Sequence, residues 1–463
     1  MVALGRPTLD REFPPMTAIF PPPASPALPA IDIKATRGRR IVVASGAQLR
    51  GEITANGAKN AATKMMASAL LTREPVVLDN VPNIDAIRTQ MELLRAIGVV
   101  VEYDPVSKQM TLVAEKLTTS VLPPELALKE RSPFVLVGPM LARMGEVEAP
   151  KPGGCNIGAR PIDVAIRGFT KMGVELLHLN GTYKARTTGL RGARLYLDYP
   201  SHTGTETLMM AAVLAEGTTV ILNACCEPEV VALAEHLTRM GAMIRGAGTP
   251  KIEIVGVHAL HGTRTRVMPD RIEAGSFAIA AAATGGDVVI RKVIPEHLES
   301  LVHKLDEAGA EVFLRDDAIS VRRTKPLTSV EVQAMHYPGF PTDLQAPFCA
   351  LLTQAQGESI IYERVFENRF GYVGELRKLG AHVDVNGVNG STDQATKAYV
   401  HGPAPLAGAA VTALDLRCGI ALTIAGLMAK GSTVISDYQN VERGYEDLTG
   451  RFRSLGANLL ALD

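Results

Sequence analysis

One short phrase recurs six times along this chain of 463 residues. Each copy has a leucine or phenylalanine, a few residues, a glycine and then an alternating apolar run, as in L-L-R-A-I-G-V-V-V-E. The glycines, which recur about every 70 residues, are Gly98, Gly173, Gly241, Gly309, Gly380 and Gly456. Each copy predicts a helix that ends at a left-handed glycine and leads directly into a strand.

A second pairing, of an apolar helix with a strand, lies upstream of the glycine in most copies. The predicted helix and strand ranges are 61–71 with 75–80, 205–215 with 218–223, 274–284 with 287–291, 344–354 with 358–362, and 418–429 with 432–437, and a weaker helix spans 132–144. Units of about 70 residues are too long for a solenoid and are typical of small α/β modules packed around shared helices. The sequence therefore predicts an α/β fold of six repeated units.

The composition indicates a globular protein with more than one hydrophobic core, since 46% of the residues are apolar. Lysines and arginines together number 48, as do aspartates and glutamates. This balance creates no overall field that favours nucleic acid or a membrane surface, so we expect neither as a partner and expect any anion site to be built locally. Five cysteines without a secretory leader predict reduced thiols and a cytoplasmic location.

The segment 1–38 differs from the rest of the chain. It includes the proline- and alanine-rich run F-P-P-P-A-S-P-A-L-P-A, which predicts an extended or disordered tail. No stretch is apolar for long enough to predict a membrane span; 278–283 and 420–428 are short and predict buried helices. The histidines form no H-x-x-x-H group and the cysteines no C-x-x-C, so no metal site and no cofactor are expected.

The segment 152–163, P-G-G-C-N-I-G-A-R-P-I-D, is a glycine-rich loop that carries a thiol, Cys155, shortly before Arg160. A thiol near a cation ionises more easily and becomes a better nucleophile or acid. The alternative is that Cys155 is a small hydrophobic side chain in a turn.

Polar and charged residues recur just before the six apolar helices. They are Lys59 and Asn60, Arg131, Thr203 to Thr205, Asp270 and Arg271, Asp343, and Arg417. Helix N-termini present unpaired N–H groups and a partial positive charge, and the basic residues add to it. If the six ends surround one cleft, they predict a site for a ligand with more than one phosphate or carboxylate. The alternative for each residue is a solvated surface charge.

Several motifs together resemble one known family. They are G-A-K-N-A-A (57–62), the cysteine loop, L-M-M-A-A-V-L-A-E-G-T-T-V-I (208–221), P-D-R-I-E-A-G (269–275), Y-P-G-F-P-T-D (337–343), F-E-N-R-F (366–370), D-L-R (415–417) and R-G-Y-E-D-L (443–448). In this order they resemble the UDP-N-acetylglucosamine enolpyruvyl transferases, within the EPSP synthase-like enolpyruvyl transferases. The resemblance runs from about residue 41 to the end.

The resemblance implies a two-domain inverse α/β barrel with three repeated units in each domain. Units one to three, with the cysteine loop, would form one domain from 59 to 268. The segments 39–58 and 269–463 would form the other with units four to six, and 1–38 would be the tail. The substrates would bind between the domains.

The resemblance also implies a reaction. The enolpyruvyl group of phosphoenolpyruvate would move to the 3-hydroxyl of UDP-N-acetylglucosamine with release of phosphate, the first committed step of peptidoglycan synthesis. Such an addition and elimination needs an acid, a base and cations that hold phosphate and carboxylate. By resemblance Cys155 is the acid and the target of fosfomycin, and Asp343 takes the proton of the acceptor hydroxyl. The residues that would hold phosphoenolpyruvate or lie beside it are Lys59, Arg160, Arg443, Arg131 and Arg417.

The acceptor-binding residues also follow from the resemblance. Asn60 and Asp343 would contact the amino sugar, and Ser201, His202 and Thr203 occupy a loop on the side that receives the nucleotide's phosphates. The residues expected to line the nucleotide are Arg160, Pro161, Ile162, Asp163, Val164, Val365 and Arg369.

The chain departs from the family pattern on the phosphate side. Ala165 stands where the family usually has histidine, Tyr199 where it has lysine, and Cys225 and Cys226 where it has alanine and arginine. Losing two such groups could cost about 1 to 3 kcal/mol each, and His202 would be a partial replacement. Three alternatives therefore stay open: the same transfer to another uridine nucleotide such as UMP, a non-catalytic nucleotide-binding paralogue, and a shikimate-type transferase.

Overall fold

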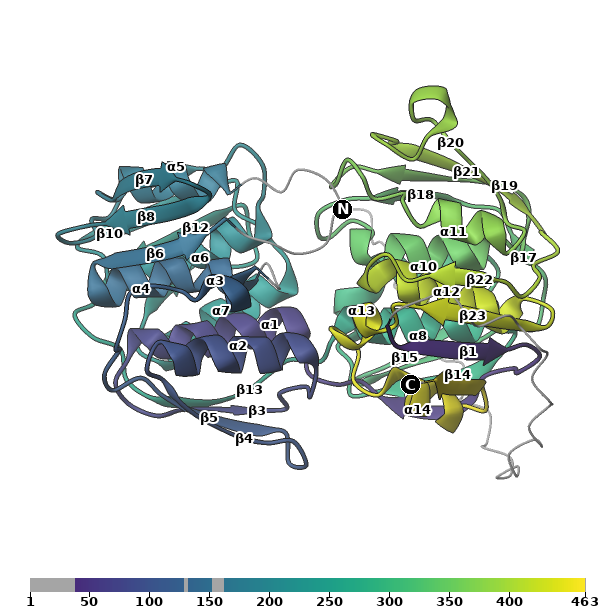
Figure 1. Ribbon diagram of the computed structural model, residues 1–463, viewed down its shortest axis with the longest axis horizontal. Coiled ribbons are helices and arrows are strands. Elements are labelled where there is room, and N and C mark those ends of the chain that lie inside the picture. Colours follow the sequence, from purple (N-terminus) through teal and green to yellow (C-terminus); the bar gives the residue numbers. More distant parts are fainter. Residues whose placement is uncertain (1–37, 129–131, 152–161, 463) are drawn as a thin grey trace, which may run out of the picture.

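The computed structural model describes residues 38–128, 132–151 and 162–462. It forms two lobes that lie side by side (Figure 1). One lobe contains the elements from α1 to β13, and the other contains β1, β2 and the elements from α8 to the C-terminus. Residues 1–37 of the predicted tail and four predicted site residues, Arg131, Cys155, Arg160 and Pro161, lie outside the described residues.

The described strands form six small sheets, three in each lobe, which confirms the predicted six-unit α/β fold. In the first lobe the sheets are β13(Thr263–Arg266)-β3(Val76–Asp79)-β5(Gln109–Val113)-β4(Val100–Asp104), β6(Glu146–Pro150)-β8(Thr182–Arg186)-β7(Glu175–Leu179) and β11(Met243–Arg245)-β12(Lys251–Val255)-β10(Thr218–Leu222)-β9(Arg194–Tyr196). In the second lobe they are β15(Glu311–Arg315)-β16(Ala318–Arg322)-β14(Asp287–Arg291)-β2(Arg50–Thr54), β17(Leu327–Thr328)-β19(Ala355–Glu363)-β21(Lys397–Gly402)-β20(His382–Val385) with β18(Glu331–Ala334) beside β19, and β22(Ala410–Thr412)-β23(Ser432–Ser436)-β1(Arg40–Ala44)-β24(Asn458–Leu462).

All six repeat glycines have a left-handed backbone, with φ between +89° and +102°. Each follows one of six helices: α2(Asp85–Ala96), α5(Asp163–Lys171), α7(Pro228–Arg239), α9(Glu299–Glu307), α11(Val373–Lys378) and α14(Leu448–Ser454). In every copy the N–H of the residue after the glycine donates to a carbonyl of the preceding helix, at 2.9–3.2 Å, and a strand begins shortly after the glycine. The predicted helix ends are therefore confirmed as one repeated capping motif.

The second set of helices is buried on nearly every side. It consists of α1(Lys59–Ser68) continued by η1(Ala69–Leu71), η2(Ser132–Leu136) continued by α4(Val137–Met144), α6(His202–Ala212), α8(Arg271–Ala283), α10(Thr342–Leu352) and α12(Leu416–Met428). Every residue of α8 is buried, as expected for a helix that is apolar nearly all round. Shorter helical turns are α3(Pro124–Ala127), η3(Pro295–Leu298), η4(Val388–Gly390) and α13(Gln439–Glu442).

Two separate hydrophobic cores form around these helices. One takes its residues from Ile41 to Ala55 and from Ile272 to Leu459, and the other from Ala58 to Met268. The domain boundaries expected at 58/59 and 268/269 remain a proposal, which this division of the cores supports. In the described part of the chain, no helix is both long and apolar enough to span a membrane.

The chain crosses between the lobes twice, and the two crossings pair with each other. Gly57 bridges to Pro269, the Ala58 N–H donates to the Met268 carbonyl at 2.7 Å, and the Asp270 N–H donates to the Asn56 carbonyl at 2.8 Å. This pairing brings the first turns of α1 and α8 together, although the two helices are far apart in sequence.

Candidate active site between the lobes

Asp343, in the first turn of α10, is held between two arginines. Its Oδ1 lies 2.6 Å from the Nη2 of Arg369, and its Oδ2 lies 2.6 Å from the Nη2 of Arg417. Arg417 is in the first turn of α12, where Asp415 caps the helix, and Arg369 lies in the segment between β19 and α11. Three residues predicted from distant motifs are thus brought into direct contact.

The electrostatics of this group keep Asp343 ionised. Burial by itself raises the pKa of Asp343, but the charges of Arg417, Arg369 and Lys59 hold that pKa well below its usual range. The same contact keeps the pKa of Arg417 raised in spite of its burial. A carboxylate stabilised in this way is a weak base, so Asp343 is suited to accept a hydrogen bond from a hydroxyl group and orient it.

Lys59 begins α1, and its backbone N–H donates to Asp270 Oδ2 at 3.1 Å. Asp270 also caps α8, since its Oδ1 accepts from the N–H groups of Ile272 and Glu273. The charge of Lys59 acts on Asp343, so a cation from the first lobe lies near the carboxylate of the second. Asn60, next in α1, is partly exposed.

Ser201, His202 and Thr203 lie at the start of α6, as the sequence indicates. Ser201 caps the helix by accepting the Gly204 N–H at 3.1 Å. His202 Nε2 lies 3.1 Å from Oε1 of Glu206, and Lys64 Nζ from α1 lies 3.4 Å from Oε2 of the same carboxylate. Burial and the charge of Lys64 lower the pKa of His202, but the carboxylates of Glu206 and Glu227 raise it, and the net shift is upward, so the imidazole gains a proton more readily than usual. This favours a cation at the start of α6.

Sequence reasoning missed Lys64 and Glu206, because it assigned both helices only by their apolar residues. Their side chains are 8% and 0% exposed, and a charged residue inside an apolar run is the signal that could have revealed them.

A second charged cluster joins the lobes; the sequence indicated Arg271 as a candidate for the anion site, but it did not indicate the carboxylates that pair with it. Arg271 of α8 donates to both carboxylate oxygens of Glu229 in α7 at 3.1–3.3 Å. Glu227, just before α7, lies 3.9 Å from Nδ1 of His336 and accepts from the thiol of Cys225. Burial raises the pKa of Cys225 well above its usual value, so this thiol stays a donor. Cys225 therefore has a structural contact of its own.

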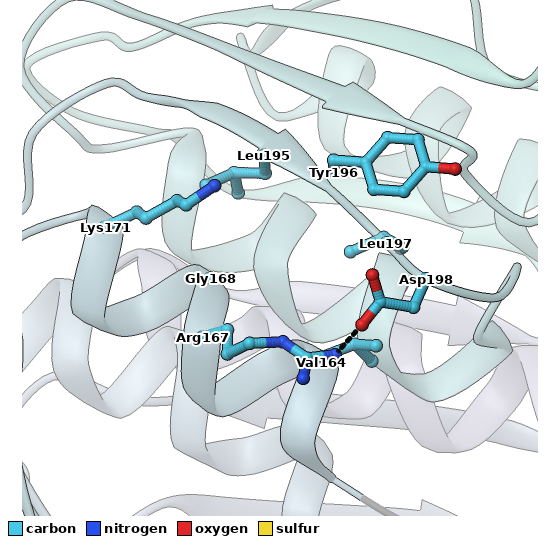
Figure 2. Close-up of a pocket in the computed structure, with 8 residues that line it drawn as sticks. All are labelled: Val164, Arg167, Gly168, Lys171, Leu195, Tyr196, Leu197 and Asp198. Atoms are coloured by element: carbon cyan, nitrogen blue, oxygen red, sulfur yellow. Dashed lines mark hydrogen bonds and ion pairs between the residues drawn. The ribbon is translucent and has the colours of Figure 1, made fainter.

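The expected nucleotide wall is described from Ile162 onward. Asp163 and Val164 begin α5, and a β-carbon at Gly204 would lie 2.9 Å from Val164, so α5 and the first turn of α6 are in close contact. A pocket of about 210 Å³ opens beside this wall, between α5 and β9 (Figure 2). Arg167 points across the pocket and forms ion pairs with Asp163 and Asp198, whose carboxylates compensate its positive charge.

The remaining predicted residues lie at two further helix-flanking positions. Val365 follows β19, and its N–H donates to Glu363 Oε1 at 2.8 Å, while Glu363 Oε2 accepts from the hydroxyl of Thr342 at the start of α10. Val365 is thereby held beside the helix that carries Asp343. Arg443 directly follows α13. Among the described residues, no group of histidine, cysteine and carboxylate side chains could hold a metal ion.

Comparison with known proteins gives a consistent result. The family model of EPSP synthase (3-phosphoshikimate 1-carboxyvinyltransferase) matches residues 43–452. The chain is 44% identical over 411 residues to UDP-N-acetylglucosamine 1-carboxyvinyltransferase 1 of Carboxydothermus hydrogenoformans, covering 89% of this chain and 95% of that protein. It is 43% identical over 422 residues to UDP-N-acetylglucosamine 1-carboxyvinyltransferase of Koribacter versatilis, covering 91% and 96%.

Solved structures agree on the fold. The enolpyruvyl transferase NikO from Streptomyces tendae has a TM-score of 0.82 at 25% identity, covering 92% of this chain and 99% of that one. EPSP synthase from Acinetobacter baumannii has a TM-score of 0.70 at 18% identity, covering 92% and 100%, which bears on the fold alone. With the two-lobed, six-unit fold and the match over most of its length, the chain belongs to the EPSP synthase family of enolpyruvyl transferases.

Proposed function

We propose that this protein is a transferase that moves the enolpyruvyl (1-carboxyvinyl) group of phosphoenolpyruvate to the 3-hydroxyl of UDP-N-acetylglucosamine and releases phosphate. This would place it at the first committed step of peptidoglycan precursor synthesis. The observation that carries the proposal is the group of Asp343 with Arg369 and Arg417, near which Lys59 approaches from the other lobe. The names of the relatives at 41–44% identity supply the acceptor.

The chemistry assigns each residue a task. The acceptor oxygen bonds to C2 of phosphoenolpyruvate while C3 gains a proton; the C2–O bond to phosphate then breaks and C3 loses a proton. Asp343 would accept the hydrogen bond of the hydroxyl and take its proton once the arginines bind substrate anions. Lys59 and Arg417, with Arg443, would neutralise carboxylate and phosphate.

Cys155 would be the acid, with Arg160 and Arg131 as further cations. These three roles rest on the motif resemblance, since the residues lie outside the described ranges. The residues that would bind the acceptor are Asn60, Ser201, His202, Thr203, Pro161 to Val164, Val365 and Arg369. The predicted cytoplasmic location also stays a prediction.

His202 bears on the choice of acceptor. UMP was an alternative because Ala165 and Tyr199 replace the histidine and lysine expected on the phosphate side. The carboxylate of Glu206 helps to raise the pKa of His202, which favours the protonated imidazole at the start of α6, and a protonated His202 would offset part of that loss. Together with the names of the relatives at 43–44% identity, which specify UDP-N-acetylglucosamine, this favours the amino-sugar nucleotide.

The test is phosphate release and product mass with phosphoenolpyruvate and, in separate reactions, UDP-N-acetylglucosamine, UMP and 3-phosphoshikimate. We expect turnover with the first acceptor. Turnover with only one of the other two would replace the proposed acceptor, and the absence of turnover with all three would favour the non-catalytic paralogue.

A paired variant experiment tests the acid. Cys155→Ala should abolish transfer and labelling by fosfomycin, while Cys226→Ala, which removes a partly exposed thiol, should retain both. Full activity in Cys155→Ala would remove Cys155 from the mechanism.

A further inference from the structure

Tyr445 lies against the Asp343 group, although no motif argument assigned it a role. Its side chain is among the largest fully buried ones, at 1% exposure. Its hydroxyl lies 3.1 Å from Nη1 of Arg417 and 2.7 Å from Oγ of Ser276 in α8. The residue therefore connects the arginine of α12 with a second buried helix.

The direction of each hydrogen bond in this chain can be assigned from the protons of its members. Ser276 donates its single proton to the Ile272 carbonyl at 2.8 Å, so its oxygen must accept from the hydroxyl of Tyr445. The oxygen of Tyr445 in turn accepts from Arg417, which has no acceptor atom. The hydrogen bonds therefore run from Arg417 to Tyr445, from Tyr445 to Ser276 and from Ser276 to the Ile272 carbonyl.

Two corners of the Arg417 guanidinium are held, one by this series of hydrogen bonds and the other by Asp343. Nη1 is held by Tyr445 and Nη2 by Asp343, and the guanidinium carbon lies 5.7 Å from the centre of the Tyr445 ring. The opposite end of the chain is anchored in the first turns of α8, which Asp270 caps. The orientation of Arg417 toward Asp343 is thus set by a neighbouring helix.

We propose that Tyr445 is a positioning residue of the transfer reaction, which holds the Arg417 guanidinium in register with Asp343. It acts through Arg417. The inference rests on the proposed function for its kinetic consequences, but the geometry it describes is a property of the protein without substrate. Burial raises the pKa of Tyr445, which keeps its proton in place for Ser276.

The test compares Tyr445→Phe with Tyr438→Phe. Both tyrosines are buried, at 1% and 2% exposure, and Tyr438 has no hydrogen bond to Arg417 or Asp343 among the contacts of the described residues. Loss of one hydrogen bond to a charged group predicts a decrease in kcat of about 10- to 100-fold in Tyr445→Phe, with less than about a 3-fold change in the KM of the acceptor. Tyr438→Phe should keep the kcat of the wild type.

The pH profile separates positioning from a purely structural effect. A looser Arg417 stabilises the Asp343 carboxylate less, so the acidic limb of the kcat profile should move to higher pH in Tyr445→Phe. Ser276→Ala, which keeps the contact between Arg417 and Tyr445, should show a smaller shift in the same direction. The Ser276→Ala variant also provides the test if Tyr445→Phe does not fold.

A measurement without turnover keeps the inference separate from the proposed function. In protein labelled with ¹⁵N-arginine, the Nη–H signals of Arg417, assigned through Arg417→Lys, should show restricted rotation in the wild type and in Tyr438→Phe. They should lose it in Tyr445→Phe. An inactive wild type that shows this difference would refute the proposed function alone. Unchanged Arg417 signals, or unchanged kcat and pH profile in an active protein, would overturn the role of Tyr445.

Discussion

The buried ion pair between Arg271 and Glu229 should be a major contact between the lobes. Arg271 comes from α8 of one lobe and Glu229 from α7 of the other, their side chains are 8% and 2% exposed, and three N···O distances of 3.1–3.3 Å join them. Removing one partner leaves the other charge buried without compensation, which typically costs about 3 to 5 kcal/mol. Arg271→Met should therefore lower the free energy of unfolding by that amount.

The double variant makes this prediction sharper. Burial raises the pKa of Glu229 while Arg271 lowers it, and the net shift is downward, so the carboxylate is charged at neutral pH. In Arg271→Met/Glu229→Met neither charge is left alone, and the loss should be smaller than in either single variant. For a lobe of about 200 residues, a loss of about 3 to 5 kcal/mol corresponds to a decrease in Tm of about 6 to 20 °C.

Thermal unfolding at neutral pH, followed by far-UV circular dichroism, provides the assay, because the chain contains no tryptophan to report by fluorescence. Calorimetry should accompany it, since two lobes can unfold in separate transitions. Losses that add in the double variant, or single variants within about 1 kcal/mol of the wild type, would refute the reasoning that the pair is coupled.

Four single sites allow further tests. Gly456→Ala should lower the free energy of unfolding by about 1 to 2 kcal/mol from backbone strain alone, because φ is +91° and no atom of the described chain lies within 4 Å of the added carbon. Gly98→Ala should lower it by more, because its β-carbon would also lie 2.8 Å from the Lys116 carbonyl. Equal losses of the free energy of unfolding in urea would contradict this. Burial lowers the pKa of His236 to about 4, so the unfolded chain binds the extra proton first and stability should fall by roughly 3 kcal/mol as the pH decreases from about 6.5 to 4. His236→Gln should flatten that part of the stability profile, and an unchanged slope would assign it to other groups. His202→Gln should raise the KM of the nucleotide acceptor about 10-fold near neutral pH. In the wild type this KM should rise as the pH increases and His202 loses its proton, and the variant should not show that rise. A KM equal to that of the wild type would exclude a contact between His202 and the phosphates.

The units of the fold could be predicted because their signal is local. Gly98 and its five counterparts adopt a left-handed backbone conformation that other residues rarely tolerate, so a single glycine predicts the end of each helix. The partners of the edge strands could not be predicted, since β2 joins β14 and β13 joins β3 across long intervening stretches of the chain. Such pairings depend on how whole units pack.

The candidate site divides in the same way. The motifs contain Asp343, Arg369 and Arg417, and the family resemblance gave each of them a separate role near the substrates. The tertiary structure decided the contacts within the site. It places Asp343 between both arginines, Tyr445 against one of them, and the Glu206 carboxylate beside the imidazole of His202. The physical reason is that residue types and helix ends depend on neighbours in sequence. Protonation and orientation depend instead on burial and on charges that only folding brings within a few ångströms.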